Sequence, residues 1–127
     1  MDPEVADPRC RIGGIALDIP IIASAMDGVV DVEMAAALTK LGSLGVLNLE
    51  GIQTRYPDPR PVLKKISSID KNEFVPLMQE LYSEPIKKEL IERRIQEIKS
   101  LGGLAAVSGT PIAAIRYREI IAKAGAD

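Results

Sequence analysis

The stretch from Ile19 to Leu49 constrains the fold of this chain more than any other part of the sequence. Its first apolar run, Ile19 to Ala23, is followed by a helical segment, Gly42 and a second apolar run from Val46. Strand, helix and strand within about thirty residues have the size of one parallel βαβ unit. Ligands of such units bind at the carboxyl ends of the strands. The residues expected at these ends are Ser24, Met26, Asp27, Asn48 and Glu50.

The helix inside this unit has clear boundary signals. Asp31 can cap its amino terminus, and Gly42 suits the left-handed residue that ends a helix. Spacing at i, i+3, i+4 and i+7 predicts a stripe facing the core, consisting of Met34, Ala37, Leu38 and Leu41. The apolar run before the helix lacks alternation, which predicts a strand covered on both faces.

Other elements are expected on both sides of this unit. In chain order they are a hairpin around Gly13-Gly14, a helix at 60–68, a weakly helical stretch at 70–81, a helix at 84–101, a strand at 104–108 and a helix from 111 to about 124. The helix at 84–101 is predicted to be the longest, with Ser83 as its cap and Pro85 in its first position. Thr110 and Pro111 are expected to begin the last helix in the same way.

Three strands with helical crossovers predict an α/β fold with a parallel sheet. The even spacing favours the first three βα units of a (β/α)8 TIM barrel, with an N-terminal hairpin, over a doubly wound fold. Residues 1–127 are therefore interpreted as the N-terminal part of a single TIM-barrel domain. No G-x-G-x-x-G motif follows a strand, so a Rossmann dinucleotide site has no support.

Composition excludes several classes of function. The net charge of −2 gives no support for binding to nucleic acid or to an anionic membrane, and no apolar run reaches the roughly 18 residues of a membrane helix. The absence of histidine removes the Ser-His-Asp triad and the commonest metal ligand, so no metal site and no catalytic residue is assigned. Cys10 is the only cysteine and is expected to be a small half-buried residue. A cytoplasmic location is the default expectation.

Longer motifs carry a resemblance to a known family. Ile19-Pro-Ile-Ile-Ala-Ser-Ala-Met-Asp-Gly-Val-Val-Asp, with Gly42-Ser-Leu-Gly-Val-Leu-Asn, resembles the first βαβ unit of inosine-monophosphate dehydrogenases and guanosine-monophosphate reductases. Ala105-Ala-Val-Ser-Gly-Thr-Pro resembles their third unit. Asn48-Leu-Glu-Gly-Ile-Gln-Thr-Arg-Tyr-Pro-Asp-Pro resembles a dehydrogenase-like subgroup without the paired regulatory CBS domains. Helical sequence at about 70–102 stands in place of those domains.

The resemblance implies an oxidoreductase of purine nucleotide biosynthesis. Family members transfer a hydride at purine C2 through a thioimidate, use NAD or NADP, act on IMP, XMP or GMP, and form homotetramers of whole barrels. The family's catalytic cysteine would lie beyond residue 127, so this chain is expected to be a barrel fragment that does not catalyse alone. Dehydrogenase and reductase activities both remain open.

The family's site residues map onto the strand ends of this chain. Ser24 and Met26 are implied to contact the purine nucleotide, and Asp27 either holds their turn by bonding backbone N–H groups or orients the ligand. The residues implied on the cofactor side are Asn48, Ser108 and Thr110. A plain N-cap role is an equal alternative for Thr110.

Two other hypotheses about the function of the chain remain open. One is a different phosphate-binding TIM-barrel enzyme, for example a flavin-dependent one, in which Ser24, Met26 and Asp27 have no special role. The other is a non-catalytic, truncated interaction module. An incomplete barrel would leave two sheet edges and one apolar sheet face uncovered, which favours aggregation.

Overall fold

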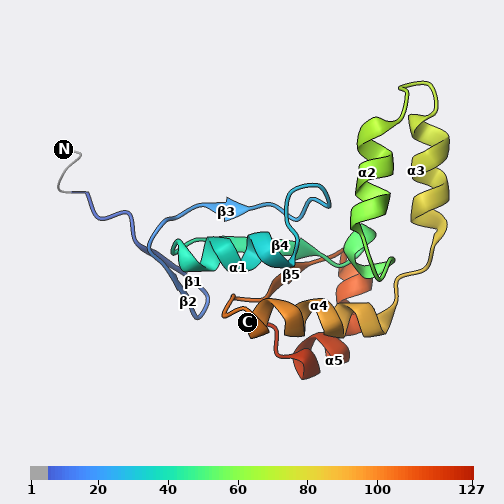
Figure 1. The fold of residues 1–127 in the computed structure, drawn as a ribbon. Helices are drawn as coiled ribbons and strands as arrows, with labels where there is room; N and C mark the ends of the chain where they lie inside the picture. The colour runs from blue at the N-terminus through green and yellow to red at the C-terminus, as the bar shows by residue number, and fades with distance from the viewer. Residues whose placement is uncertain (1–5) are drawn as a thin grey trace.

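The computed structural model describes residues 6–127 and has a mixed α/β fold (Figure 1). The elements are β1 (Cys10–Ile12), β2 (Ile15–Leu17), β3 (Ile22–Ala23), α1 (Val32–Lys40), β4 (Leu44–Asn48), the 3-10 helix η2 (Ile52–Thr54), α2 (Arg60–Ser68), α3 (Phe74–Ser83), α4 (Lys88–Ser100), β5 (Ala106–Ser108) and α5 (Pro111–Ala124). The predicted order of elements is therefore present, although all three strands of the expected parallel sheet have somewhat different limits.

The strands form the two expected sheets. β1 and β2 pair antiparallel, and Gly13 at their turn has a φ of 56°, which glycine adopts at little cost. β3, β4 and β5 form a parallel sheet in chain order, with Ile22 opposite Leu44 and Val46 opposite Ala106. Because the three strands run in one direction, their carboxyl ends meet at one edge of this sheet.

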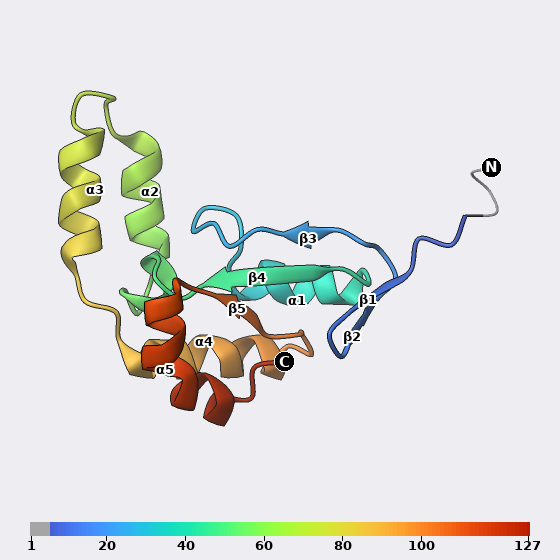
Figure 2. The same cartoon turned by 180° about the vertical axis from the view of Figure 1, so that it is seen from behind.

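The helices divide into two groups (Figures 1 and 2). α1, α4 and α5 pack around the parallel sheet, where Leu47, Ile91 and Ile95 are fully buried in an aliphatic core. α2 and α3 form a helical arm, residues 60–83, that projects away from the sheet. Leu77 and Leu81 of this arm pack with Ile52 in a second, smaller core. Among residues 6–127, no helix combines the length and apolar character needed to cross a membrane.

The predicted core stripe of α1 is wrong at Met34, Ala37 and Leu41. Ala35 and Ala36 are its buried residues, whereas Met34 and Leu41 are 40% and 65% exposed. Glycines opposite the helix explain the difference. A Cβ on Gly45 would lie 2.9 Å from the Ala35 Cα, and a Cβ on Gly103 would lie 2.9 Å from the Ala36 Cα. Only small residues fit at this distance, so Met34 and Leu41 face outward, while Leu38 is half-buried against Gly45.

The prediction of a strand covered on both faces is also wrong. β3 lies at the edge of the parallel sheet and pairs only with β4. Ile21 and Ile22 are 63% and 42% exposed. Uninterrupted apolar strands are usually buried on both faces, but the described residues place no second layer over this run.

The start of the helix predicted at 84–101 is wrong as well. Ser83 is the last residue of α3, and α4 begins at Lys88 after an extended link. The Lys87 N–H donates to the Thr54 carbonyl at 2.9 Å, which holds the link in place. α4 has 13 residues and α5 has 14, so α4 is not the longest helix. The buried residues of α4 include Leu90, Ile91, Ile95 and Ile98, which face the core.

Candidate functional site at the strand ends

Asp27 is the best-connected side chain at the carboxyl edge of the sheet. Its Oδ1 accepts a hydrogen bond from Asn48 Nδ2 at 3.1 Å, and its Oδ2 accepts the Ile52 N–H at 2.9 Å and the Tyr82 hydroxyl. Gly51 lies so close that a Cβ there would fall within the Asp27 carboxylate. Asp27 therefore does bond a backbone N–H, and it also anchors two side chains from other elements.

Tyr82 brings the helical arm to this edge. Its hydroxyl donates to Asp27, and the Arg55 guanidinium lies over its ring, 5.4 Å from the centroid. Burial and the hydrogen-bonded, negatively charged Asp27 raise the pKa of Tyr82, against a smaller opposing effect of Arg55. The phenol therefore stays protonated and remains a donor at neutral pH.

Glu50 links the second strand end to the third. Its Oε2 accepts the Thr110 N–H at 2.6 Å, and its Oε1 accepts the Thr110 hydroxyl at 3.2 Å. The Glu50 N–H donates to Asn48 Oδ1 at 3.0 Å. Thr110 Oγ1 also accepts the Ala113 N–H at 3.3 Å, so the N-cap role of Thr110 is confirmed.

Arg55 completes the arrangement. Its Nε and Nη2 donate to the Glu50 carbonyl at 3.1 and 2.9 Å, and its Nη1 donates to the Glu84 carbonyl. We call these linked side chains the strand-end cluster: Asp27, Asn48, Glu50, Arg55, Tyr82 and Thr110. It spans the carboxyl ends of all three parallel strands.

Ser24, Met26 and Ser108 lie beside this cluster with free side chains. Met26 is 51% exposed, and Ser24 and Ser108 are exposed. Within residues 6–127, neither serine hydroxyl has a hydrogen-bond partner, while their carbonyls accept the Met26 and Leu49 N–H groups at 2.8 and 2.9 Å. The turn backbone is thus fixed, and three side chains remain available to a ligand.

The sequence-predicted site residues therefore fall into two groups. Asp27, Asn48 and Thr110 are joined to the strand-end cluster, whereas Ser24, Met26 and Ser108 stand next to it unengaged. Sequence reasoning assigned no role to Tyr82 or Arg55. No local pattern could have assigned one, because Tyr82 lies 55 residues from Asp27 in the chain.

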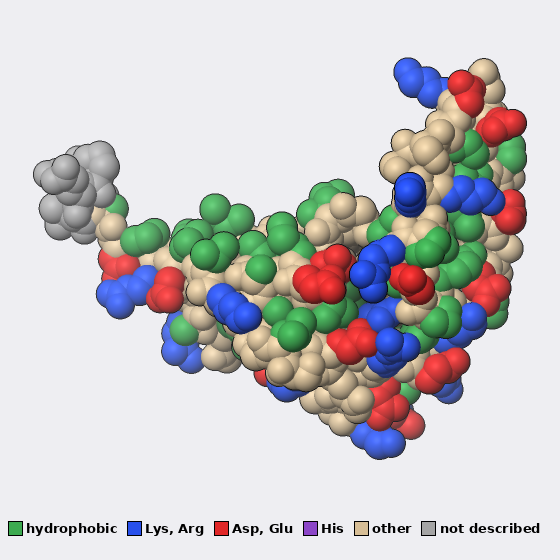
Figure 3. All heavy atoms as spheres, in the orientation of Figure 1, with side chains coloured by type: hydrophobic (Ala, Val, Ile, Leu, Met, Phe, Trp, Pro, Cys, Tyr) green, Lys and Arg blue, Asp and Glu red, His purple; other side chains and the backbone are tan. Residues whose placement is uncertain are grey.

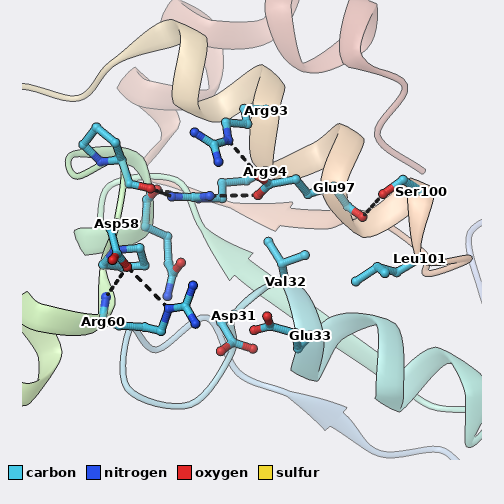
Figure 4. A pocket seen from close by; sticks show the side chains of 13 residues that line it. Asp31, Val32, Glu33, Asp58, Arg60, Arg93, Arg94, Glu97, Ser100 and Leu101 are labelled. Carbon is cyan, nitrogen blue, oxygen red and sulfur yellow. Dashed lines mark hydrogen bonds and ion pairs between the residues drawn. The ribbon is translucent and has the colours of Figure 1, made fainter.

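A separate hollow of about 440 Å³ lies on the helical side, between α1, α4 and the turn before α2 (Figure 4). It contains none of the predicted site residues. Arg60 pairs with Asp58 there, and Arg93 and Arg94 pair with Glu97. Burial raises the pKa of Glu97, but hydrogen bonds and charge from these two arginines outweigh burial and hold that pKa below its ordinary value. Most of the charged side chains that line this hollow are thus paired with one another.

Residues 6–127 contain no group of three or more His, Cys, Asp or Glu side chains arranged to hold a metal ion.

Comparison with known proteins finds oxidoreductases among the relatives of this chain. An uncharacterized oxidoreductase from Mycolicibacterium smegmatis is 30% identical over 122 residues, which are 92% of this chain and 32% of the relative. The inosine-5'-monophosphate dehydrogenase of Korarchaeum cryptofilum is 28% identical over 118 residues, 93% of this chain and 24% of that enzyme. The chain thus spans about a third or less of the length of these curated relatives.

The solved structures give the same relationship. The crystal structure of an IMP dehydrogenase/GMP reductase-like protein from Corynebacterium glutamicum superposes with a TM-score of 0.87 at 29% identity, covering 95% of this chain and 34% of that one. The family described as IMP dehydrogenase / GMP reductase domain matches residues 3–70, more than half of the chain. The chain belongs to this family.

Proposed function

We propose that this chain forms the first three βα units of a (β/α)8 barrel oxidoreductase that acts on a purine nucleotide, IMP, XMP or GMP. One observation carries the proposal beyond family membership. The Ser24 and Met26 side chains are exposed at the end of β3, on a turn whose next residue, Asp27, is held by three donors. A turn that is already held in place and carries free side chains suits a binding site, because little conformational entropy is lost when a ligand binds.

The substrate side follows from the chemistry of these residues. The Ser24 hydroxyl can donate to or accept from a polar atom of the nucleotide. The Met26 thioether is apolar and polarizable, which suits contact with the face of a purine. Asp27 is engaged on both carboxylate oxygens, so its role is to hold the turn.

Fewer of the proposed cofactor contacts have a free polar group than the sequence predicts. NAD or NADP would exchange the hydride with purine C2, and Asn48, Ser108 and Thr110 are the proposed contacts. The Asn48 amide uses Nδ2 for Asp27 and Oδ1 for the Glu50 N–H, and the Thr110 hydroxyl bonds Glu50. Ser108 is therefore the residue of the three with a free hydroxyl for the cofactor.

The reacting thiol would come from outside this chain. Cys10 lies in β1, in the hairpin at the opposite end of the parallel sheet from Asn48 (Figures 1 and 2). It cannot form the thioimidate at a nucleotide bound beside Met26. We propose that a cysteine from the rest of a whole barrel supplies the nucleophile, in a homotetramer of such barrels, and that residues 1–127 alone bind but do not turn over substrate.

Nuclear magnetic resonance titration of the isotope-labelled chain tests this proposal. IMP, XMP or GMP should shift the Ser24 amide and the Met26 methyl resonances, and NAD or NADP should shift Ser108. Ser24→Ala and Met26→Ala should each weaken nucleotide binding about ten-fold, the equivalent of one lost contact of about 1.4 kcal/mol. Leu41→Ala is the control, because Leu41 is also exposed but follows the last residue of α1, at the end of this helix away from the Ser24–Met26 turn.

The alternatives give different results in the same titration. A flavin-dependent barrel would respond to FMN and not to purine mononucleotides. An interaction module would respond to neither, and that outcome would refute the proposal. In an intact enzyme containing this chain, turnover of IMP with NAD against GMP with NADPH would decide between dehydrogenase and reductase.

A further inference from the structure

We infer that Tyr82 is a positioning residue for nucleotide recognition, acting from the helical arm through Asp27 on the Ser24–Met26 turn. The inference rests on the proposed function for its ligand, but its geometry stands independently. Tyr82 is the only residue of the helical arm, within the described chain, whose side chain hydrogen-bonds to Asp27. It is thus the direct connection between α3 and the end of β3.

Asp27 joins this hydrogen bond to the Ser24–Met26 turn. It directly follows Met26, whose N–H donates to the Ser24 carbonyl at 2.8 Å and whose carbonyl accepts the Val29 and Val30 N–H groups. Such a closed turn moves as a unit. The position of the Asp27 carboxylate therefore determines where the Ser24 hydroxyl and the Met26 thioether project.

The Tyr82 hydroxyl is one of three donors that define this position. Without it, Oδ2 of Asp27 keeps only the Ile52 N–H, and Oδ1 keeps only the Asn48 amide. The remaining donors are Asn48, the last residue of β4, and Ile52, the first residue of η2, so Asp27 would lose its one hydrogen bond to the helical arm. The turn should then sample more than one position and bind nucleotide less tightly.

The Tyr82 ring is itself held in place. The Arg55 guanidinium lies over the ring and donates to the Glu50 and Glu84 carbonyls. These hydrogen bonds fix Arg55 between the segment after β4 and the residue after α3, so Arg55 covers the ring from a fixed position. Removing the hydroxyl alone should leave this stacking intact. Tyr82→Phe therefore isolates the hydrogen bond to Asp27.

Tyr56→Phe offers a matched control. The Tyr56 hydroxyl donates to the Leu81 carbonyl at 3.0 Å, so this variant also removes one phenol hydrogen bond between the loop and α3, without touching Asp27. We expect Tyr82→Phe to raise the dissociation constant for IMP or GMP about five- to ten-fold, while the affinity for NAD changes less than about two-fold. Tyr56→Phe should leave both affinities unchanged despite a similar loss of stability.

The free protein supplies a second readout. In Tyr82→Phe the Met26 methyl and Ser24 amide resonances should shift or broaden before any ligand is added, and in Tyr56→Phe they should not. Unchanged Ser24 and Met26 resonances in Tyr82→Phe would overturn the inference. If the wild-type chain binds no nucleotide while these resonances do respond, the proposed function fails and the positioning of the turn by Tyr82 stands.

Discussion

At the residue scale, Gly51 shows how closely the strand-end cluster is packed. The residue has an ordinary negative φ, so backbone freedom does not explain glycine there. Space explains it, because the Asp27 carboxylate occupies the volume that a side chain would need. The close approach lets the Ile52 N–H reach Asp27 Oδ2 at 2.9 Å. A single missing methyl group thus permits the hydrogen bond that anchors the proposed nucleotide turn.

Gly51→Ala should therefore lower the free energy of unfolding by about 1–3 kcal/mol, the usual cost of overpacking. It should also weaken nucleotide binding, because Asp27 must move. Urea denaturation and the titration described above measure the two effects. Gly28→Ala is the control, since a Cβ on Gly28 meets nothing within 4 Å. Equal stability of the two variants would contradict the explanation.

At the scale of elements, α4 holds the loop after β4 through one buried arginine. Arg94 is 5% exposed and donates to the carbonyls of Gln53, Tyr56 and Pro57 at 3.0, 3.2 and 2.8 Å. It also pairs with Glu97 at 2.8 Å (Figure 4). The loop it holds carries Arg55 and leads into the helical arm. Arg94 thus fixes the base of the arm that brings Tyr82 to the site.

Arg94→Met should cost about 2–4 kcal/mol in unfolding free energy, because three carbonyls lose their buried, charged donor. Arg93→Met should cost less than about 1 kcal/mol, since Arg93 is largely exposed and shares the same partner, Glu97. Chemical denaturation of both variants checks the difference. A cost for Arg93→Met as large as that for Arg94→Met would show that Glu97, rather than the loop carbonyls, carries the effect.

At the scale of the whole molecule, the structure has apolar surface that its own helices do not cover. Hydrophobic side chains follow the β3 segment in the space-filling view (Figure 3). Ile21, immediately before this edge strand, is 63% exposed, and Ile112 and Ile115 of α5 are 71% and 69% exposed. Exposed apolar strands with an unpaired edge associate readily. Two thirds of the matched Corynebacterium glutamicum chain has no counterpart here.

The isolated chain should therefore self-associate as its concentration rises. Ile21→Lys should reduce the association, because it puts a charge directly beside the edge strand. Leu41→Lys is the control, since Leu41 is as exposed but lies at the end of α1. Sedimentation velocity at several concentrations measures the effect. A chain that stays monomeric throughout would contradict the prediction.

The sequence by itself determined the features that depend on neighbouring residues. Asp31 and Thr110 cap their helices, Gly42 and Gly125 end them in the left-handed conformation, and the parallel order of the strands follows from their helical crossovers. These features need only local hydrogen bonds and backbone freedom, which a short stretch of sequence encodes.

Only the tertiary structure decided which surfaces meet. The glycines of β4 and of the turn after α4 turned the alanines of α1 inward, against its apolar periodicity. The buried Arg94 and the exposed Arg93 are neighbours of the same type, so charge pattern could not separate them. Tyr82 reaches Asp27 because the helical arm returns the chain to the strand ends, 55 residues after Asp27. Contacts of this kind depend on how whole elements pack, and no spacing within one element encodes them.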